Sequence, residues 1–250
     1  MLFPGIGQCQ KDPIKNKFEN DHFLHSADCR STFNQLEAMK PRIFLTTVSL
    51  ALALLSCPAQ AGFKEGVEAY QAGNLPLAFK EFQTAAKSGH ADSQFNLALM
   101  YEKGMGVGKD EKEALNWYRK SAEQGNSNAQ YNLGVLYENG RGCDVDFAQA
   151  NQWYRKAAVQ GDPLAIGNLG MLYLRGDGVK VDKIAGLALL LRSVTLDSSP
   201  ENNAKMNIAG TKGLTPEMVT AAQALSQEFE NAKSLLIPLD QYLKNKGQTP

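Results

Sequence analysis

The sequence NWYRKSAEQG at residues 116–125 returns as QWYRKAAVQG at residues 152–161, with seven of its ten letters unchanged. The step from Trp117 to Trp153 is 36 residues. The same step links Gly89, Gly125 and Gly161; Asn96, Asn132 and Asn168; Leu97, Leu133 and Leu169; Tyr101, Tyr137 and Tyr173; Gly104, Gly140 and Gly176; and Asp110, Asp146 and Asp182. Identical residues in step at this many positions indicate an array of structural repeats.

Each repeat is predicted to be a pair of helices. In residues 128–140, NAQYNLGVLYENG, apolar positions recur at the spacing of one helix face. Gly140 is expected to end this helix, because glycine adopts the left-handed conformation at low cost. Asp146, with Gln149 three residues later, predicts a capping box at the start of the second helix, and the preceding repeat has the same arrangement. Neither helix can bury its apolar face alone, so we expect an all-α fold of stacked helix pairs, a right-handed α-solenoid.

The pattern NLxxxYxxGxGV…D…A…WYRKAA…G at this period resembles the Sel-one-like (suppressor-enhancer-of-lin) repeat, a relative of the tetratricopeptide repeat. Residues 90–125 and 126–161 match it closely. Residues 162–196 match in the first helix but degenerate in the second, where Leu189 and Leu190 replace Trp and Tyr. The resemblance implies a scaffold that binds proteins or peptides, and it implies no reaction.

The two ends of the array are expected to differ from the repeats. Residues 62–89 predict a shorter, tetratricopeptide-like unit with a compressed turn. Residues 197–250 predict a polar linker, a C-terminal capping helix and a tail that is frayed after Lys244. The capping helix is expected to begin after Thr215, with Pro216 at its first position. Such a helix would cover the exposed apolar end of the solenoid.

The composition near the N-terminus predicts export. A short basic segment is followed by an apolar run and then by small residues, which is the three-part pattern of a secretory signal peptide. We place this signal peptide at residues 39–61, with cleavage after Ala61, and interpret residues 1–38 as a non-native upstream extension. The predicted location is periplasmic or secreted. Lipidation at Cys57 and an uncleaved signal stay open, and membrane contact is expected only in those two cases.

Charge and cysteine content exclude several classes of function. The chain has 26 basic and 26 acidic residues, and this balance argues against a nucleic-acid partner, which usually requires a basic surface. From Gly62 onward it contains one cysteine, Cys143, and one histidine, His90, which is expected to be a solvated turn residue. These counts exclude an intramolecular disulfide and a zinc site built from Cys and His. No cofactor or metal is expected, and the WYRK aromatics are interpreted as core residues.

The recurrent Asn96, Asn132 and Asn168 are the sharpest candidates for partner contact. The resemblance implies that first helices line the concave surface, where an amide that both donates and accepts suits the main chain of a peptide. The alternative, that these asparagines tie adjacent helices together, stays open. Neighbouring candidates in the same register are Asp92, Phe95, Glu102, Lys103, Asn128, Tyr131, Glu138, Asn139 and Arg175.

The sequence therefore favours an exported, non-catalytic scaffold that binds a protein or peptide partner on its concave face. The first alternative is a β-lactam-binding or cell-wall hydrolysing accessory enzyme, because exported cysteine-rich members of the family have been associated with such activity. Those members carry cysteine pairs in each repeat, whereas the exported part of this chain has only Cys143. The second alternative is a structural spacer without a ligand groove.

Overall fold

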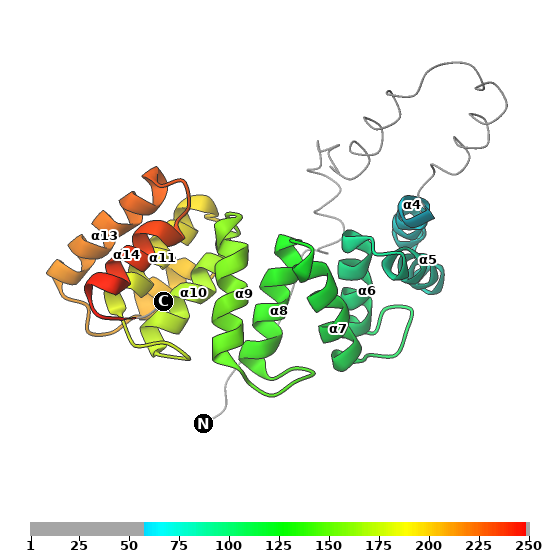
Figure 1. Ribbon diagram of the computed structural model, residues 1–250, viewed down its shortest axis with the longest axis horizontal. Coiled ribbons are helices and arrows are strands. Elements are labelled where there is room, and N and C mark those ends of the chain that lie inside the picture. The colour runs from blue at the N-terminus through cyan, green and yellow to red at the C-terminus, as the bar shows by residue number, and fades with distance from the viewer. Residues whose placement is uncertain (1–57, 249–250) are drawn as a thin grey trace, which may run out of the picture. The chain divides into compact units, whose positions relative to one another are not determined.

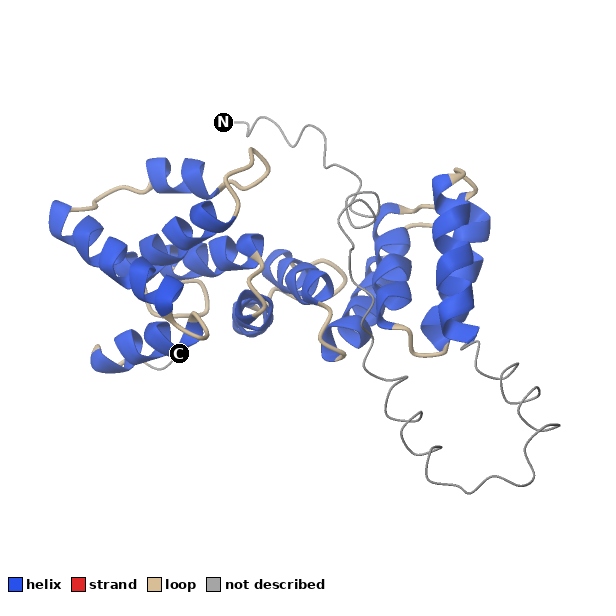
Figure 2. Cartoon of the chain, turned by 90° about the horizontal axis from the view of Figure 1, so that it is seen from above, coloured by secondary structure: helices blue, strands red, loops and turns tan. Residues whose placement is uncertain are grey.

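The computed structural model describes residues 58–248 of the chain, and every regular element in this part is an α-helix (Figure 2). The proposed upstream extension and most of the proposed signal peptide, Cys57 included, lie outside the described residues. Cleavage after Ala61 would fall in the first turn of the first described helix, α4 (Pro58–Gln71). None of the described helices is both long and apolar enough to cross a bilayer.

The helices follow one another as consecutive pairs. The pairs are α4 with α5 (Leu75–Lys87), α6 (Ala91–Lys103) with α7 (Glu111–Glu123), α8 (Ser127–Asn139) with α9 (Phe147–Val159), and α10 (Pro163–Arg175) with α11 (Lys183–Leu196). Each helix packs against the next one along the chain, both within a pair and between pairs. The helices are therefore arranged in chain order (Figure 1), and the predicted all-α solenoid is confirmed.

The first helices of the three long repeats begin with the same kind of cap. His90, Asn126 and Asp162 each accept a hydrogen bond from the backbone N–H three residues later. The expectation that His90 is a solvated turn residue is therefore wrong. Its Nδ1 accepts from the N–H of Ser93 at 3.2 Å, and its ring centroid lies 4.7 Å from that of Phe63. Asn126 and Asp162 lie one and two 36-residue steps after His90, so position 90 is a helix-cap position of the repeat. This position explains why His90 is bonded to the backbone rather than solvated.

The second helices begin at the predicted caps, Asp110, Asp146 and Asp182, whose carboxylates accept from backbone N–H groups. The reciprocal half of the predicted capping box is replaced at Asp146, whose N–H donates to the carbonyl of Tyr137 at 2.9 Å, and equally in the first long repeat. There Glu113 accepts a hydrogen bond from Trp117 Nε1 at 3.1 Å, and the N–H of Asp110 donates to the carbonyl of Tyr101 at 2.9 Å. The first helix therefore supplies the partner that the capping box would have supplied.

Glycines in the turns set the distance between neighbouring pairs. Gly106, Gly142 and Gly178 have positive φ, and a Cβ at these positions would overlap Leu75, Glu111 and Phe147 respectively. Each of these residues is the first of the preceding second helix. The turn of one pair thus presses against the start of a helix in the pair before it, which only glycine permits.

The aromatic residues of WYRK lie largely inside the array. Tyr118 and Tyr154 are fully buried and Trp153 is 7% exposed, while Trp117 is half-buried. The Nζ atoms of Lys120 and Lys156 lie 3.8 and 3.7 Å from the Trp117 and Trp153 ring centroids. The interpretation of these aromatics as core residues is confirmed, and the two lysine ammonium groups lie over the faces of the tryptophan rings.

Three helices follow the repeats. They are α12 (Ala204–Gly210), α13 (Pro216–Asn231) and α14 (Leu236–Asn245). The predicted capping helix is α13, which begins after Thr215 and packs against α11. The short helix α12 was not predicted, because its anchor is tertiary: the buried Asn202 amide donates to the carbonyl of Ser193 at 3.1 Å.

The expected frayed tail is instead attached to the last repeat. Helix α14 buries Leu239 and Leu243 in the same core as α10, α11 and α13. Beyond it, Lys246 Nζ lies 3.0 Å from Asp182 Oδ2, and Gln248 Nε2 donates to the same oxygen at 3.3 Å. The cap of α11 thus binds the tail as well, a contact that local sequence does not indicate.

Candidate partner-binding site

The three recurrent asparagines occupy three different environments. Asn96 on α6 is 3% exposed. Asn132 on α8 is half-buried and donates from Nδ2 to the carbonyl of Asn128 on its own helix at 3.0 Å. Asn168 on α10 is also half-buried but donates to the Tyr154 hydroxyl on α9 at 3.1 Å. Equal positions in the repeat therefore do not imply equal roles.

Asn168 belongs to a polar network between α8, α9 and α10. The Tyr154 hydroxyl donates to Glu138 Oε2 at 2.6 Å, and Arg175 Nη1 lies 3.8 Å from Glu138 Oε1. Burial, followed by the charge of Glu138, raises the pKa of Tyr154 far above its ordinary value. Burial also raises the pKa of the neighbouring Tyr131 to about 12. The contacts of Asn168 agree with the alternative interpretation, in which the asparagine ties adjacent helices together.

The preceding repeat contains the same tyrosine–glutamate pair. The Tyr118 hydroxyl donates to Glu102 Oε2 at 2.7 Å, and Arg141 Nη1 donates to Glu102 Oε1 at 2.8 Å. Arg141 Nε also donates to Glu111 Oε1 at 3.3 Å. Burial raises the pKa of Tyr118 well above its ordinary value, and the Glu102 carboxylate adds to the effect. Glu102 is 8% exposed, and its carboxylate binds Tyr118 of its own repeat and Arg141 of the next one.

The third repeat has lost both members of this pair together. The position of Tyr118 and Tyr154 is occupied by Leu190, and the position of Glu102 and Glu138 is occupied by Leu174. Leu190 is fully buried and Leu174 is half-buried. An apolar pair can replace a buried polar pair without leaving a donor unpaired, whereas loss of one partner cannot. This paired change accounts for the loss of the WYRK tyrosine at Leu190 in the third repeat.

Five accessible or half-buried residues lie on one side of α8. We define the α8 face as Asn128, Tyr131, Asn132, Val135 and Asn139, of which Asn128 and Asn139 are exposed and the others half-buried. Asn132 and Asn139 each donate from Nδ2 to the carbonyl four residues earlier, at 3.0 and 2.8 Å. Their Oδ1 atoms accept no hydrogen bond from residues 58–248, so they can accept one from a partner.

The remaining candidates divide between internal contacts and the surface. Asp92 accepts from Asn126 Nδ2 at 2.8 Å, which joins the starts of two successive first helices. Phe95 is buried, with its ring centroid 5.7 Å from that of Tyr118. Lys103 and Arg175 are exposed. The structure thus brings Tyr131, Glu138, Asn168 and Arg175 into one neighbourhood on α8 and α10, apart from the residues of α6.

Reasoning from the sequence missed the partners of the two glutamates, which are Tyr154 for Glu138, and Tyr118 with Arg141 for Glu102. A signal was present, because tyrosine and glutamate disappear together at Leu190 and Leu174. In the described part of the chain, no group of three or more His, Cys, Asp or Glu side chains is arranged to hold a metal ion. Burial raises the pKa of the half-buried Cys143 thiol, which disfavours its reactive thiolate form.

Comparisons with known proteins relate the repeats to a family. Three successive segments, residues 91–126, 127–162 and 163–198, match the Sel1 repeat. A solved Sel1 repeat protein from Oxalobacter formigenes is 30% identical, with a TM-score of 0.57 over 71% of this chain and 78% of that chain. A protective antigen of uropathogenic Escherichia coli with an SLR fold is 28% identical, with a TM-score of 0.44 over 74% of this chain and 48% of its own. No curated protein matches the chain.

Proposed function

We propose, because this chain belongs to the Sel1 repeat family, that it is an exported, non-catalytic scaffold that binds a protein or peptide partner through the α8 face. Sel1 repeat proteins generally mediate protein–protein interactions. In this proposal the first helices line the concave side of the solenoid, and α8 supplies its central contacts. Export rests on the signal-peptide pattern at residues 39–61.

The observation that carries the proposal is the pair of amide oxygens on α8. The amide nitrogens of Asn132 and Asn139 donate to carbonyls of their own helix. Both amide oxygens can therefore accept a hydrogen bond from a partner. The two residues are seven positions apart, so they lie on the same side of the helix about two turns apart. Tyr131 and Val135 between them supply apolar contact area. An extended peptide offers backbone N–H groups and side chains that suit this mixed surface.

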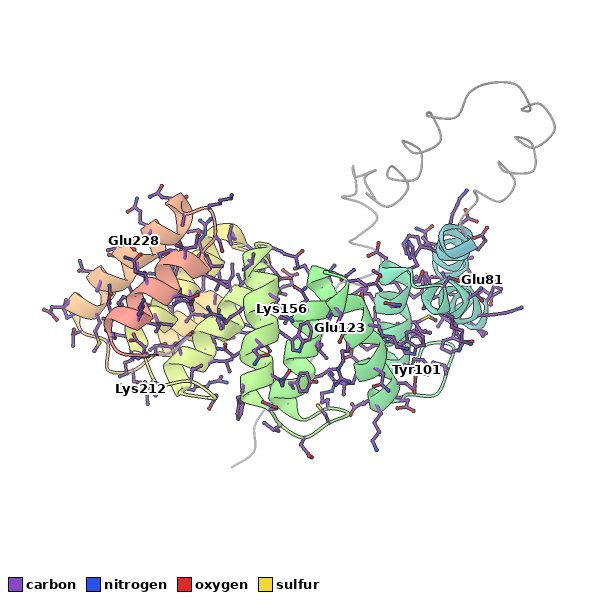
Figure 3. All side chains as sticks on the ribbon, viewed as in Figure 1. Glu81, Tyr101, Glu123, Lys156, Lys212 and Glu228 are labelled. Atoms are coloured by element: carbon purple, nitrogen blue, oxygen red, sulfur yellow. The ribbon has the colours of Figure 1, made fainter. Side chains whose placement is uncertain are left out.

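A photo-crosslinking amino acid at position 132 is expected to capture the partner in living cells. The matched control is position 123, because Glu123 is exposed on α7, a second helix (Figure 3). Once the partner is identified, Asn132→Ala is expected to weaken its affinity about five- to tenfold, as loss of one hydrogen bond would. The melting temperature of this variant should stay near that of the wild type, whereas Asn168→Ala should lower it by breaking the Tyr154 network. The same adducts from positions 132 and 123, or an unchanged affinity of Asn132→Ala, would contradict the proposal.

Export is tested by sequencing the N-terminus of the protein recovered from the periplasm. We expect a mature chain that begins at Gly62, because the small residues before it fit a signal peptidase site. A chain that begins at Cys57 with an attached lipid would establish the lipoprotein alternative. A chain that begins before Met39 would show that residues 39–61 are not a signal peptide.

A further inference from the structure

Helix α14 is bound to the last repeat by an apolar face and a charged edge. Leu239 and Leu243, one turn apart, are fully buried in the core that contains residues of α9, α10, α11 and α13. Next to the first of these leucines, Asp240 pairs with Arg155 on α9. An amphipathic helix that lays an apolar face into a groove is a recurrent mode of recognition between proteins. The last repeat thus gives an internal example of the kind of helix that this array accepts.

The segment after α14 continues the contact along the turn between α10 and α11. Lys246 Nζ lies 3.0 Å from Asp182 Oδ2. Gly247 and Gln248 line a crevice together with Gly178 of that turn. The bound segment therefore combines two leucines four positions apart, an aspartate directly after the first leucine, and a lysine shortly after the second.

One repeat earlier, the positions beside α14 have accessible counterparts. The residues that correspond to Arg155, Tyr173 and Asp182 are Arg119, Tyr137 and Asp146. Tyr173 and Asp182 are 1% and 4% exposed, whereas Tyr137 is half-buried and Asp146 is exposed. Arg119 Nη2 donates to the Tyr137 hydroxyl at 2.7 Å, and among residues 58–248 it pairs with no carboxylate. A carboxylate on an incoming helix can therefore pair with this guanidinium.

The crevice also recurs one repeat earlier, where the tail does not line it. Gly142, Cys143 and Asp144 line it together with residues 109–112 around the start of α7. Its lining contains three carboxylates and two lysines, whereas that of the occupied crevice contains one lysine and no carboxylate. Because acidic groups outnumber basic ones there, the earlier crevice suits a basic segment such as the one after α14. The half-buried Tyr137 and Cys143 supply apolar contact area.

We propose that this surface binds an amphipathic helix of a partner protein that has the pattern of α14. We define the Arg119 groove as Arg119, Tyr137, Gly142, Asp144 and Asp146. The aspartate of the bound helix pairs with Arg119, its two leucines lie on the Tyr137 ring, and its lysine pairs with Asp146.

The chain's own α14 is not the occupant in this proposal. Four residues, 232–235, join it to α13 and keep its local concentration at the last repeat high. A helix of another protein meets no such competitor at the Arg119 groove. The groove shares no residue with the α8 face, so the proposal does not depend on the proposed function.

The test adds a peptide of residues 232–248, which contains α14, to the full mature chain. Labelled peptide is followed by fluorescence anisotropy, and the protein by NMR at the backbone amides of Gly142 and Gly178. We expect saturable binding with shifts at Gly142 alone. Replacing Leu239 and Leu243 of the peptide by alanine should abolish it, because the apolar face is lost.

Two results of this titration would overturn the proposal. Shifts at Gly178 would show that the peptide replaces the chain's own tail on the last repeat. The absence of saturable binding would show that the earlier repeat accepts no such helix.

Charge variants separate the groove from general attraction. Arg119→Gln should weaken peptide binding about tenfold or more. It should keep the melting temperature near that of the wild type, because Gln83 at the same position of the short unit bonds the Tyr101 hydroxyl. Asp240→Asn in the peptide should weaken binding by a similar factor, and the two changes combined should weaken it little further, because they remove one pair.

The matched control is Lys120→Gln, which removes the same charge from the adjacent, exposed position. It should bind the peptide like the wild type, and equal weakening by Lys120→Gln and Arg119→Gln would show nonspecific attraction and sink the proposal. Light scattering of the chain alone gives a further check. A dimer that Arg119→Gln dissociates would make a second copy of the chain the occupant, contrary to the proposal.

Discussion

Replacing Leu133 by alanine is expected to lower the free energy of unfolding by about 2–5 kcal/mol. Leu133 on α8 is fully buried and belongs to a core that also contains Tyr118 and Trp153. Removal of its isobutyl group leaves a cavity that these rigid aromatic rings cannot close, so transfer energy and packing contacts are both lost. Because each pair depends on its neighbours for its core, the loss at the centre of the array weakens the interfaces on both sides.

Urea denaturation followed by circular dichroism measures this change. The matched control is Val159→Ala, because Val159 is 51% exposed on α9 and its truncation should change stability by no more than about 0.5 kcal/mol. A loss below about 1 kcal/mol for Leu133→Ala would mean that α8 does not present this face to the core.

Replacing Glu102 by alanine is expected to cost about 2–4 kcal/mol. The substitution leaves the fully buried Tyr118 hydroxyl without its acceptor. Most of the loss comes from this hydroxyl, because Arg141 keeps its bond to Glu111 and its side chain is 31% exposed, where water screens its charge. The network therefore stabilises the repeat chiefly through the tyrosine.

A double-mutant cycle with Tyr118→Phe isolates this contribution. In the Tyr118→Phe background, Glu102→Ala should cost less, with a coupling energy of about 1–3 kcal/mol, because no hydroxyl is left unpaired. Glu123→Ala, at an exposed position on α7, serves as the control and should be nearly neutral. Additive losses in the cycle would show that the 2.7 Å contact contributes nothing to stability.

Much of the fold can be predicted from the sequence, because the same capping residues, glycines and apolar positions recur in each repeat. The aspartate caps, the glycine stops and the helix faces depend on residues within one or two turns of each other, so a single sequence determines them. His90 was misjudged only because its residue type is unusual for a cap, although its position in the register is the same as that of Asn126 and Asp162.

The candidate site was less predictable, because accessibility is a property of neighbours. Asn96, Asn132 and Asn168 share one register, yet Asn96 is 3% exposed, Asn132 donates to a carbonyl of its own helix, and Asn168 donates to the Tyr154 hydroxyl. The difference at Asn168 arises from Tyr154 on the adjacent helix, 14 residues earlier in the chain. No property of the asparagine's own helix distinguishes it from the other two.

By itself, the sequence determined the period, the pairing of helices and most of their ends, since these follow from short-range hydrogen bonds and the 36-residue register. Only the tertiary structure decided where the tail lies and which polar groups are satisfied. Asp182 pairs with Lys246, 64 residues away, and Arg155 pairs with Asp240, 85 residues away. Such contacts depend on how separate helices pack in space, because a buried polar group bonds whichever partner the packing brings within reach.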